Sequence, residues 1–223
     1  MNLRVVFDFG AVLFRWRPSW VVAQALPQCA RSPAELRRAV QDCFQDYGGD
    51  WGQFDLGHIG EDEVLARIQS RTGWSDAALK NLMRAVRAEL QAQPAVLAAL
   101  LQLQQRGLPL SYLSNMPAPL ADELERQNPL HEWFESGVFS SRVKLGKPDP
   151  AIFAHAASGL GVDDPSAFAH VGDLRRTDVG GSTAAGWTAV RYRGLNDDID
   201  ESSPDAAIVV DHHGELLAAL GLA

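Results

Sequence analysis

Short apolar runs bounded by turn residues recur along the chain, and most of them lie after position 94. Runs without alternating polar positions are typical of strands buried on both faces, as in a parallel sheet covered by helices. The pattern predicts a sheet of about five strands, at Leu3–Phe7, Leu108–Leu113, Ala167–Val171, Trp187–Arg191 and Ala206–Val210.

Helical spacing fills the segments between these later runs. The predicted crossover helices are Pro94–Gln105, Ala118–Gln127, Pro150–Ser158 and Thr177–Ala185. Pro94 suits a helix start and Gly159 a helix end. This alternation predicts an α/β fold, a Rossmann-like parallel sheet between two layers of helices, formed by residues 1–17 and 94–223.

Residues 18–93 have a different sequence pattern, with helical periodicity and no convincing strand. The predicted helices are Leu36–Phe44, Val64–Gln69 and Ala77–Leu90. We interpret this segment as an all-helical insert. Because one strand precedes it and every other strand follows, it leaves the core at the carboxyl edge of the sheet and can act as a lid.

Composition narrows the classes of function. The 223 residues carry 20 Lys and Arg against 28 Asp and Glu, a net charge of −8, which argues against nucleic acid as a partner. No run reaches the ~18 apolar residues of a membrane span, and no leader is evident. Cys29 and Cys43 lack metal-ligand spacing and suit a reducing compartment, so we expect a cytoplasmic protein, of undefined oligomeric state.

Polar residues follow several of the predicted strands. Asp8 ends the first strand, and Ser114 and Asn115 follow the second, ahead of a helix. The carboxyl ends of parallel strands share one edge of a sheet, where α/β enzymes keep reactive groups. A turn-forming role for Asp8 and a helix cap at Ser114 are the plainer alternatives.

Two later loops add charges to the same edge. Lys147 lies between Gly146 and Pro148, which preset its backbone, and Asp173 and Asp178 follow a strand. Carboxylates gathered beside Asp8 would repel one another without a cation, and hard oxygen ligands are what magnesium prefers.

These residues form four ordered motifs, and together they resemble the haloacid dehalogenase-like hydrolase superfamily. The motifs are Val5–Leu13, Leu113–Asn115, Lys147–Pro148, and Gly172–Asp173 with Asp178. The insert after the first motif resembles the cap of the phosphatase subgroup. The Asp-x-Gly form of the first motif is similar to that of bacterial α-glucose-1-phosphate phosphatases.

The resemblance implies a Mg²⁺-dependent phosphatase acting on a small phosphorylated metabolite, for example a sugar phosphate. Asp8 would be the nucleophile that forms an aspartyl-phosphate. Ser114 would bind the phosphoryl group, Asn115 would shape its pocket, and Lys147 would neutralise charge. The implied metal ligands are Asp8, the Gly10 carbonyl, Asp173 and Asp178, the last directly or through water.

One position departs from the family pattern. Most phosphatases of the superfamily have a second Asp two residues after the nucleophile, as general acid and base, and here that position is Gly10. Loss of such a group costs ~10²–10⁴-fold for poor leaving groups. Good leaving groups would be preferred, or water or an insert residue would supply the proton. Asp55, His58 and Glu61 are candidates, with solvated loops as the alternative.

Further residues have both a functional and a structural interpretation. Arg15 and Arg17 follow the nucleophile loop and are candidates to bind an anionic substrate. Tryptophans of the insert region can stack on a sugar ring or simply pack in the core: Trp16, Trp20 and Trp51. His212 and His213 have no third metal ligand nearby, so we expect a surface pair at a helix start.

Two other functions stay open at this point. A carbon-halogen hydrolase would use the same aspartate without metal, but Asp173 and Asp178 would repel a haloacid carboxylate. A binding or regulatory protein that has lost turnover is suggested by Gly10 and opposed by the joint presence of Asp8, Lys147 and Asp173.

Overall fold

A computed structural model describes residues 3–45, 48–194 and 202–222 of the chain. Its centre is a sheet of six parallel strands in the order β3-β2-β1-β4-β5-β6. The strands are β1 (Arg4–Phe7), β2 (Leu110–Ser114), β3 (Ser136–Phe139), β4 (Phe168–Gly172), β5 (Thr188–Tyr192) and β6 (Ile208–Val210). The predicted α/β class with a parallel sheet is therefore confirmed.

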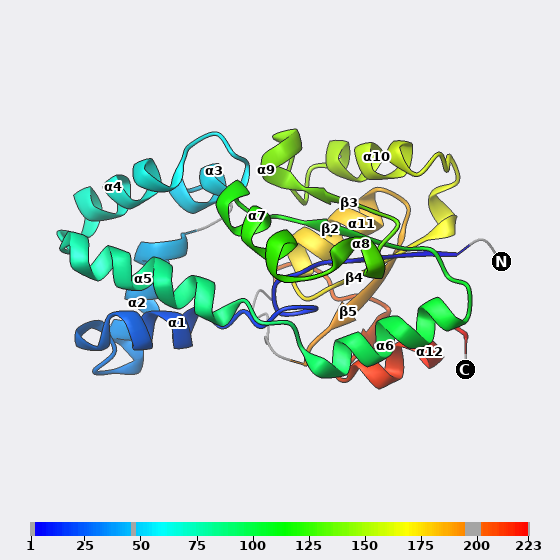
Figure 1. Ribbon diagram of the computed structural model, residues 1–223, viewed down its shortest axis with the longest axis horizontal. Coiled ribbons are helices and arrows are strands. Elements are labelled where there is room, and N and C mark those ends of the chain that lie inside the picture. Colours follow the sequence, from blue (N-terminus) through cyan, green and yellow to red (C-terminus); the bar gives the residue numbers. More distant parts are fainter. Residues whose placement is uncertain (1–2, 46–47, 195–201, 223) are drawn as a thin grey trace.

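Helices cover both faces of the sheet (Figure 1). One face packs on α6 (Pro94–Gln105), α7 (Ala118–Gln127), α8 (Leu130–Trp133) and α12 (Leu216–Ala219). The opposite face packs on α10 (Pro150–Gly159), with α9 (Ser140–Val143) and α11 (Gly181–Ala184) beside it. Residues alternate between the two cores, since Val5 and Phe7 of β1 enter the first and Val6 enters the second.

In the described part of the insert, five α-helices lie together to one side of the sheet in Figure 1. They are α1 (Pro18–Ala25), α2 (Pro33–Phe44), α3 (Asp50–Asp55), α4 (Glu61–Thr72) and α5 (Asp76–Glu89). Ser32 and Ser75 cap α2 and α5 by accepting a bond from a backbone N–H in the first turn. Gly73 ends α4 in the left-handed region, with φ of 70°.

Two adjacent chain segments connect the insert to the sheet. The Gln93 N–H donates to the Leu13 carbonyl (3.0 Å), and the Arg15 N–H donates to the Gln91 carbonyl (3.0 Å). Arg17 binds the buried Glu89 carboxylate through two bonds of 2.6 and 3.0 Å, which ties the start of α1 to the end of α5.

The structure differs from the predicted elements and burial in several places. The edge strand β3 was not predicted, because its four residues include only two apolar ones. The short helices α1 and α3 were also not predicted. His213 is buried rather than exposed, since its ring lies 3.1 Å from the Tyr192 hydroxyl and 3.0 Å from the Val12 carbonyl.

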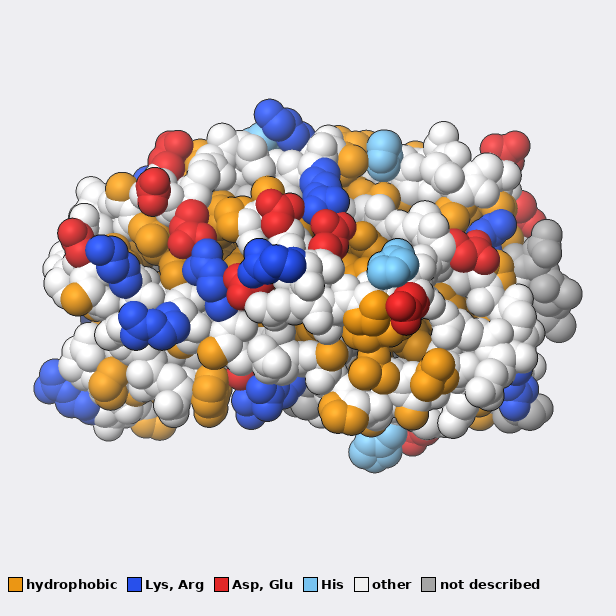
Figure 2. All heavy atoms as spheres, in the orientation of Figure 1, with side chains coloured by type: hydrophobic (Ala, Val, Ile, Leu, Met, Phe, Trp, Pro, Cys, Tyr) orange, Lys and Arg blue, Asp and Glu red, His pale blue; other side chains and the backbone are white. Residues whose placement is uncertain are grey.

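Both cysteines are free thiols, with Cys43 buried and Cys29 half-buried, and burial raises the pKa of Cys43 to about 12. Among the described residues, no helix has the length and apolar character to cross a membrane. Acidic and basic side chains are interspersed on the face that Figure 2 shows.

Gly137 gives a test of the β2–β3 packing. A Cβ atom at this position would lie 2.0 Å from the Tyr112 ring. We predict that Gly137→Ala lowers the free energy of unfolding by about 1–3 kcal/mol, because the ring or the edge strand must shift. Urea unfolding measures this change. Gly159→Ala is the control, since no heavy atom lies within 4 Å of its new Cβ, and an equal loss in both variants would contradict the prediction.

Candidate active site

Asp8 follows β1 at the carboxyl edge of the sheet and is only 8% exposed. Its N–H donates to the Val171 carbonyl (2.9 Å), which continues the pairing of β1 with β4. The chain then turns sharply, since the Phe9 carbonyl accepts bonds from three successive N–H groups and Ala11 has φ of 56°. The turn leaves the Asp8 carboxylate at the end of a rigid strand.

Lys147 lies between two of the predicted carboxylates. Its Nζ is 3.0 Å from Asp8 Oδ1 and 2.5 Å from Asp178 Oδ1, and all three side chains are buried. Burial favours the neutral amine, but the negative charges of Asp178 and Asp8 outweigh it and raise the pKa of Lys147 above its usual range. Lys147 is therefore a fixed cation.

Asn115 sets the position of Lys147. Its side-chain amide donates to the Lys147 carbonyl (2.9 Å) and accepts from the Lys147 N–H (2.8 Å). The Lys147–Pro148 peptide bond is cis. Asn115 thus acts on the backbone of the lysine loop, and the neighbouring Ser114 lies buried at the end of β2.

Asp178 is fully engaged by other groups of the protein. Oδ1 accepts from Lys147 and lies 3.0 Å from His170 Nε2, while Oδ2 accepts from the Leu174 N–H (3.0 Å) and the Thr177 hydroxyl (3.3 Å). Burial opposes ionisation, but Lys147 and His170 lower the pKa of Asp178 well below its usual range.

Gly172 makes this arrangement possible. A Cβ atom at this position would lie 2.3 Å from the Asp178 Cβ, so any other residue would displace the carboxylate. Asp178 lies in a π-helical turn, Arg175–Gly180, that runs into α11. A widened turn of this kind is common at functional sites.

Asp8, Asp173 and Asp178 offer carboxylate oxygens that all lie within 4.8 Å of one another. Asp8 Oδ1 is buried and has no hydrogen bond of good geometry from the described residues. Burial also raises the pKa of Asp8, an effect that the Lys147 charge partly offsets. Three buried acids beside one lysine form a donor set of hard oxygens, and this set suits a divalent cation such as Mg²⁺.

These groups form one end of a cavity of about 260 Å³. Asp8, Gly10, Ser114, Lys147 and Asp173 all line it. The opposite walls come mainly from the insert and from the start of α7, and they are mostly apolar or aromatic: Trp16, Pro18, Phe44, Trp51, Leu90, Met116, Pro117 and Leu120.

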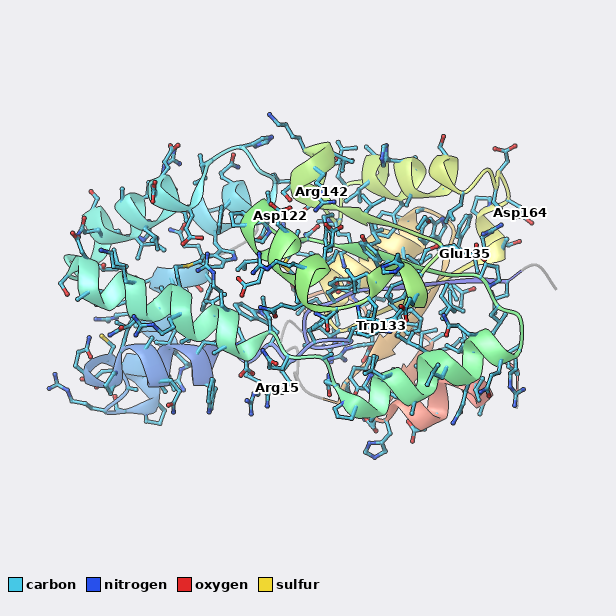
Figure 3. The ribbon with its side chains drawn as sticks, in the orientation of Figure 1. Arg15, Asp122, Trp133, Glu135, Arg142 and Asp164 are labelled. Carbon is cyan, nitrogen blue, oxygen red and sulfur yellow. The ribbon has the colours of Figure 1, made fainter. Side chains whose placement is uncertain are left out.

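The structure does not bring Arg15 to this cavity. Arg15 lies beside the connection between α5 and α6 (Figure 3), and it is not among the lining residues. Arg17 is bound to Glu89, as described above, with its guanidinium over the exposed Trp20 ring at 5.0 Å. The sequence suggested both arginines only because they are close to Asp8 along the chain.

Of the three proton-donor candidates in the insert, only Asp55 is among the described residues that line the cavity. Asp55 lines the cavity. Glu61 instead pairs with Arg87 (2.5 Å), and the exposed His58 lies 3.0 Å from the Gln53 side chain. Neither Glu61 nor His58 lines the cavity.

His170 and Thr177 both contact Asp178, and the sequence indicated a role for neither. A buried histidine two residues before a glycine at a strand end was the available signal for His170. Thr177 carried no such signal, because its contact depends on the widened turn.

The sequence and the fold of this chain match those of known proteins. The family model of haloacid dehalogenase-like hydrolases matches residues 5–186. A glyceraldehyde 3-phosphate phosphatase of Methanopyrus kandleri is 30% identical over 195 residues, which are 83% of this chain and 79% of that protein.

Solved structures share the fold across nearly the whole chain. L-2-haloacid dehalogenase from Xanthobacter autotrophicus has a TM-score of 0.72 at 19% identity, with 99% of each chain covered. A HAD family enzyme from Bacteroides thetaiotaomicron, in complex with magnesium and inorganic phosphate, has a TM-score of 0.69 at 18% identity and covers 91% of this chain and 99% of its own. The resemblance seen in the four motifs is confirmed, and the chain belongs to the haloacid dehalogenase-like hydrolase family.

Proposed function

We propose that this hydrolase is a magnesium-dependent phosphatase that acts on a small phosphorylated metabolite through an aspartyl-phosphate on Asp8. The observation that carries the proposal is the buried Asp8 carboxylate, held beside Lys147 and facing a cavity that Ser114 and Asp173 also line. The relative from Methanopyrus kandleri, named a glyceraldehyde 3-phosphate phosphatase, supports the same reaction class.

Each residue has a distinct task in this reaction. An Asp8 oxygen attacks phosphorus in line with the leaving oxygen, and water later hydrolyses the aspartyl-phosphate. Lys147 neutralises charge as the two anions approach, and Ser114 donates to a phosphoryl oxygen. Asn115 fixes the lysine loop through its two bonds to Lys147, which is a positioning task rather than a contact with substrate.

Asp8, Asp173 and the Gly10 carbonyl would hold the Mg²⁺. When bound, the cation supplies positive charge that lets the anionic nucleophile and the phosphate meet. Asp178 already accepts bonds from four groups, so we assign it to holding Lys147 rather than to direct metal binding. Asp173 and Asp178 also oppose haloacid hydrolysis, since buried anions repel a substrate carboxylate.

We also propose that residues 18–93 act as a cap that selects the substrate. The cavity wall on the cap side includes Phe44, Trp51 and Leu90 of the cap and Trp16, which lies just before it, and the three aromatic rings pack edge to face. In the described part of the lining, Lys147 is the only Lys or Arg, and it is bound to the catalytic carboxylates. A leaving group without a negative charge therefore fits this cavity best.

Metal and nucleophile are tested together. With p-nitrophenyl phosphate and Mg²⁺ we expect turnover that EDTA abolishes and added Mg²⁺ restores. Asp8→Asn should lower kcat by at least about 10³-fold, because the amide cannot form the phosphoenzyme. Asp163→Asn, an exposed site outside the cavity, is the control. Halide release from 2-haloacids that is indifferent to EDTA would contradict the proposal.

The charge of the leaving group is tested with matched esters. Ethyl phosphate and phosphoglycolate both carry two carbons and differ by a carboxylate. We predict a kcat/KM at least about tenfold lower for phosphoglycolate, since its carboxylate has no free cation in the described cavity. Phenyl phosphate and 4-carboxyphenyl phosphate form a second pair. A higher kcat/KM for the carboxylated member of both pairs would refute the proposal that the cavity favours a leaving group without a negative charge.

A further inference from the structure

Gly10 leaves the proposed reaction without its usual proton donor, and the inference below rests on that proposed function. A Cβ atom at Gly10 would meet the Trp16 side chain at 3.6 Å, an ordinary contact. Crowding by Trp16 therefore does not explain the glycine. An unactivated alkoxide leaves phosphorus slowly without a proton, so another group must supply one.

Among the described residues that line the cavity, four carry titratable side chains: Asp8, Asp55, Lys147 and Asp173. The proposed reaction already uses Asp8, Lys147 and Asp173. Asp55 is the remaining acid, and it comes from the insert, whereas the other three come from the core. It therefore comes from the part of the cavity wall that we propose selects the leaving group.

The chain at Asp55 and Leu56 contacts the core next to two loops of the proposed site, the Ser114 loop and the Lys147 loop. The Ser140 hydroxyl donates to the Asp55 carbonyl (2.5 Å) and accepts from the Met116 N–H (2.9 Å), next to the Ser114 loop. A Leu56 methyl lies so close to Gly146 that a Cβ there would be 2.8 Å away, next to the Lys147 loop. Asp55 is thus held at a fixed place relative to both loops.

Gly57, two residues after Asp55, makes a further contact with the core at the short helix α9. Gly57 has φ of 66°, and its Cα approaches the Ser141 carbonyl so closely that a Cβ atom would lie 2.6 Å from the oxygen. Arg142 of α9 donates to Asp122 (3.0 Å) and Glu125 (2.9 Å) of α7, and Figure 3 shows Arg142 beside Asp122. The contact between insert and core is therefore itself rigidly supported.

The Asp55 carboxyl group has no side-chain partner among the described residues and a raised pKa. It is half-buried, and no described side chain donates a hydrogen bond to it or pairs with it. Burial, with the negative charge of Asp8 added, raises the pKa of Asp55 well above its usual range. A carboxyl group that lines the same cavity as the nucleophile can give a proton to a leaving oxygen and so act as a general acid.

We propose that Asp55 is the general acid and base that replaces the missing side chain at position 10. As Asp8 attacks phosphorus and the bond to the leaving oxygen breaks, the Asp55 proton passes to that oxygen and releases an alcohol. The Asp55 carboxylate then takes a proton from the water that attacks the phosphoenzyme. The bond between phosphorus and Asp8 breaks, and inorganic phosphate leaves with Asp8 ionised and Asp55 protonated again.

The test compares leaving groups in Asp55→Asn. For ethyl phosphate, whose alkoxide needs a proton, kcat/KM should fall by ~10²–10⁴-fold. For p-nitrophenyl phosphate it should change by no more than about threefold, because nitrophenolate leaves unprotonated. kcat/KM reports the steps through leaving-group departure, so a slower second step does not mask this difference. Asp62→Asn, an exposed site on α4, is the matched control.

Restoring the usual acid gives the second arm of the experiment. Adding Gly10→Asp to Asp55→Asn should raise kcat/KM for ethyl phosphate by at least about tenfold. An equal loss on both substrates, no loss on ethyl phosphate, or a double variant as slow as Asp55→Asn would overturn the assignment. Failure of the wild-type enzyme to hydrolyse either ester with Mg²⁺ would instead refute the proposed function.

A third variant keeps the proposal testable if Asp55→Asn does not fold. Gly10→Asp alone should raise kcat/KM for ethyl phosphate by less than about tenfold, since a proton donor is already present. A larger gain would show that the native enzyme lacks one and would overturn the role of Asp55.

Discussion

The buried ammonium group of Lys147 lies between the carboxylates of Asp8 and Asp178, and the rest of the site is arranged around this charge compensation. Removing one partner from such a buried pair costs about 3–5 kcal/mol, because the remaining charge stays desolvated. The contact therefore fixes the Asp8 carboxylate in position and keeps it close to a permanent cation. Asn115 and Gly172 serve the same contact, the first through the lysine backbone and the second by leaving room for Asp178.

The sheet and the insert contribute different parts of the chemistry. Parallel strands β1, β2 and β4 end at one edge, so the groups that we propose handle phosphate are held by the most buried part of the molecule. The insert adds aromatic rings and Asp55 on the other side of the cavity. In the proposed reaction, this division separates phosphoryl transfer at the core from selection of the leaving group by insert residues such as Trp51 and Leu90.

The sequence predicted the core of the site because its polar residues interrupt buried apolar runs, as Asp8 does after Phe7. It predicted Pro94–Gln105 and Ala118–Gln127 as helices with the observed bounds, since proline starts and regular apolar spacing mark them. It did not predict β3, whose pairing depends on Gly137 beneath the Tyr112 ring. It could not choose among Asp55, His58 and Glu61, because only the folded contacts of the insert show which one faces the cavity.

The central claim, that Asp8 carries the phosphoryl group, is tested most directly by mass spectrometry of enzyme quenched in acid during turnover with Mg²⁺. The account predicts the mass of one added phosphoryl group on the peptide that contains Asp8, and its loss when the quenched protein is treated with base. A phosphoryl group on a different residue would contradict it. So would rapid turnover in which the peptide that contains Asp8 carries no added phosphoryl group at any quench time.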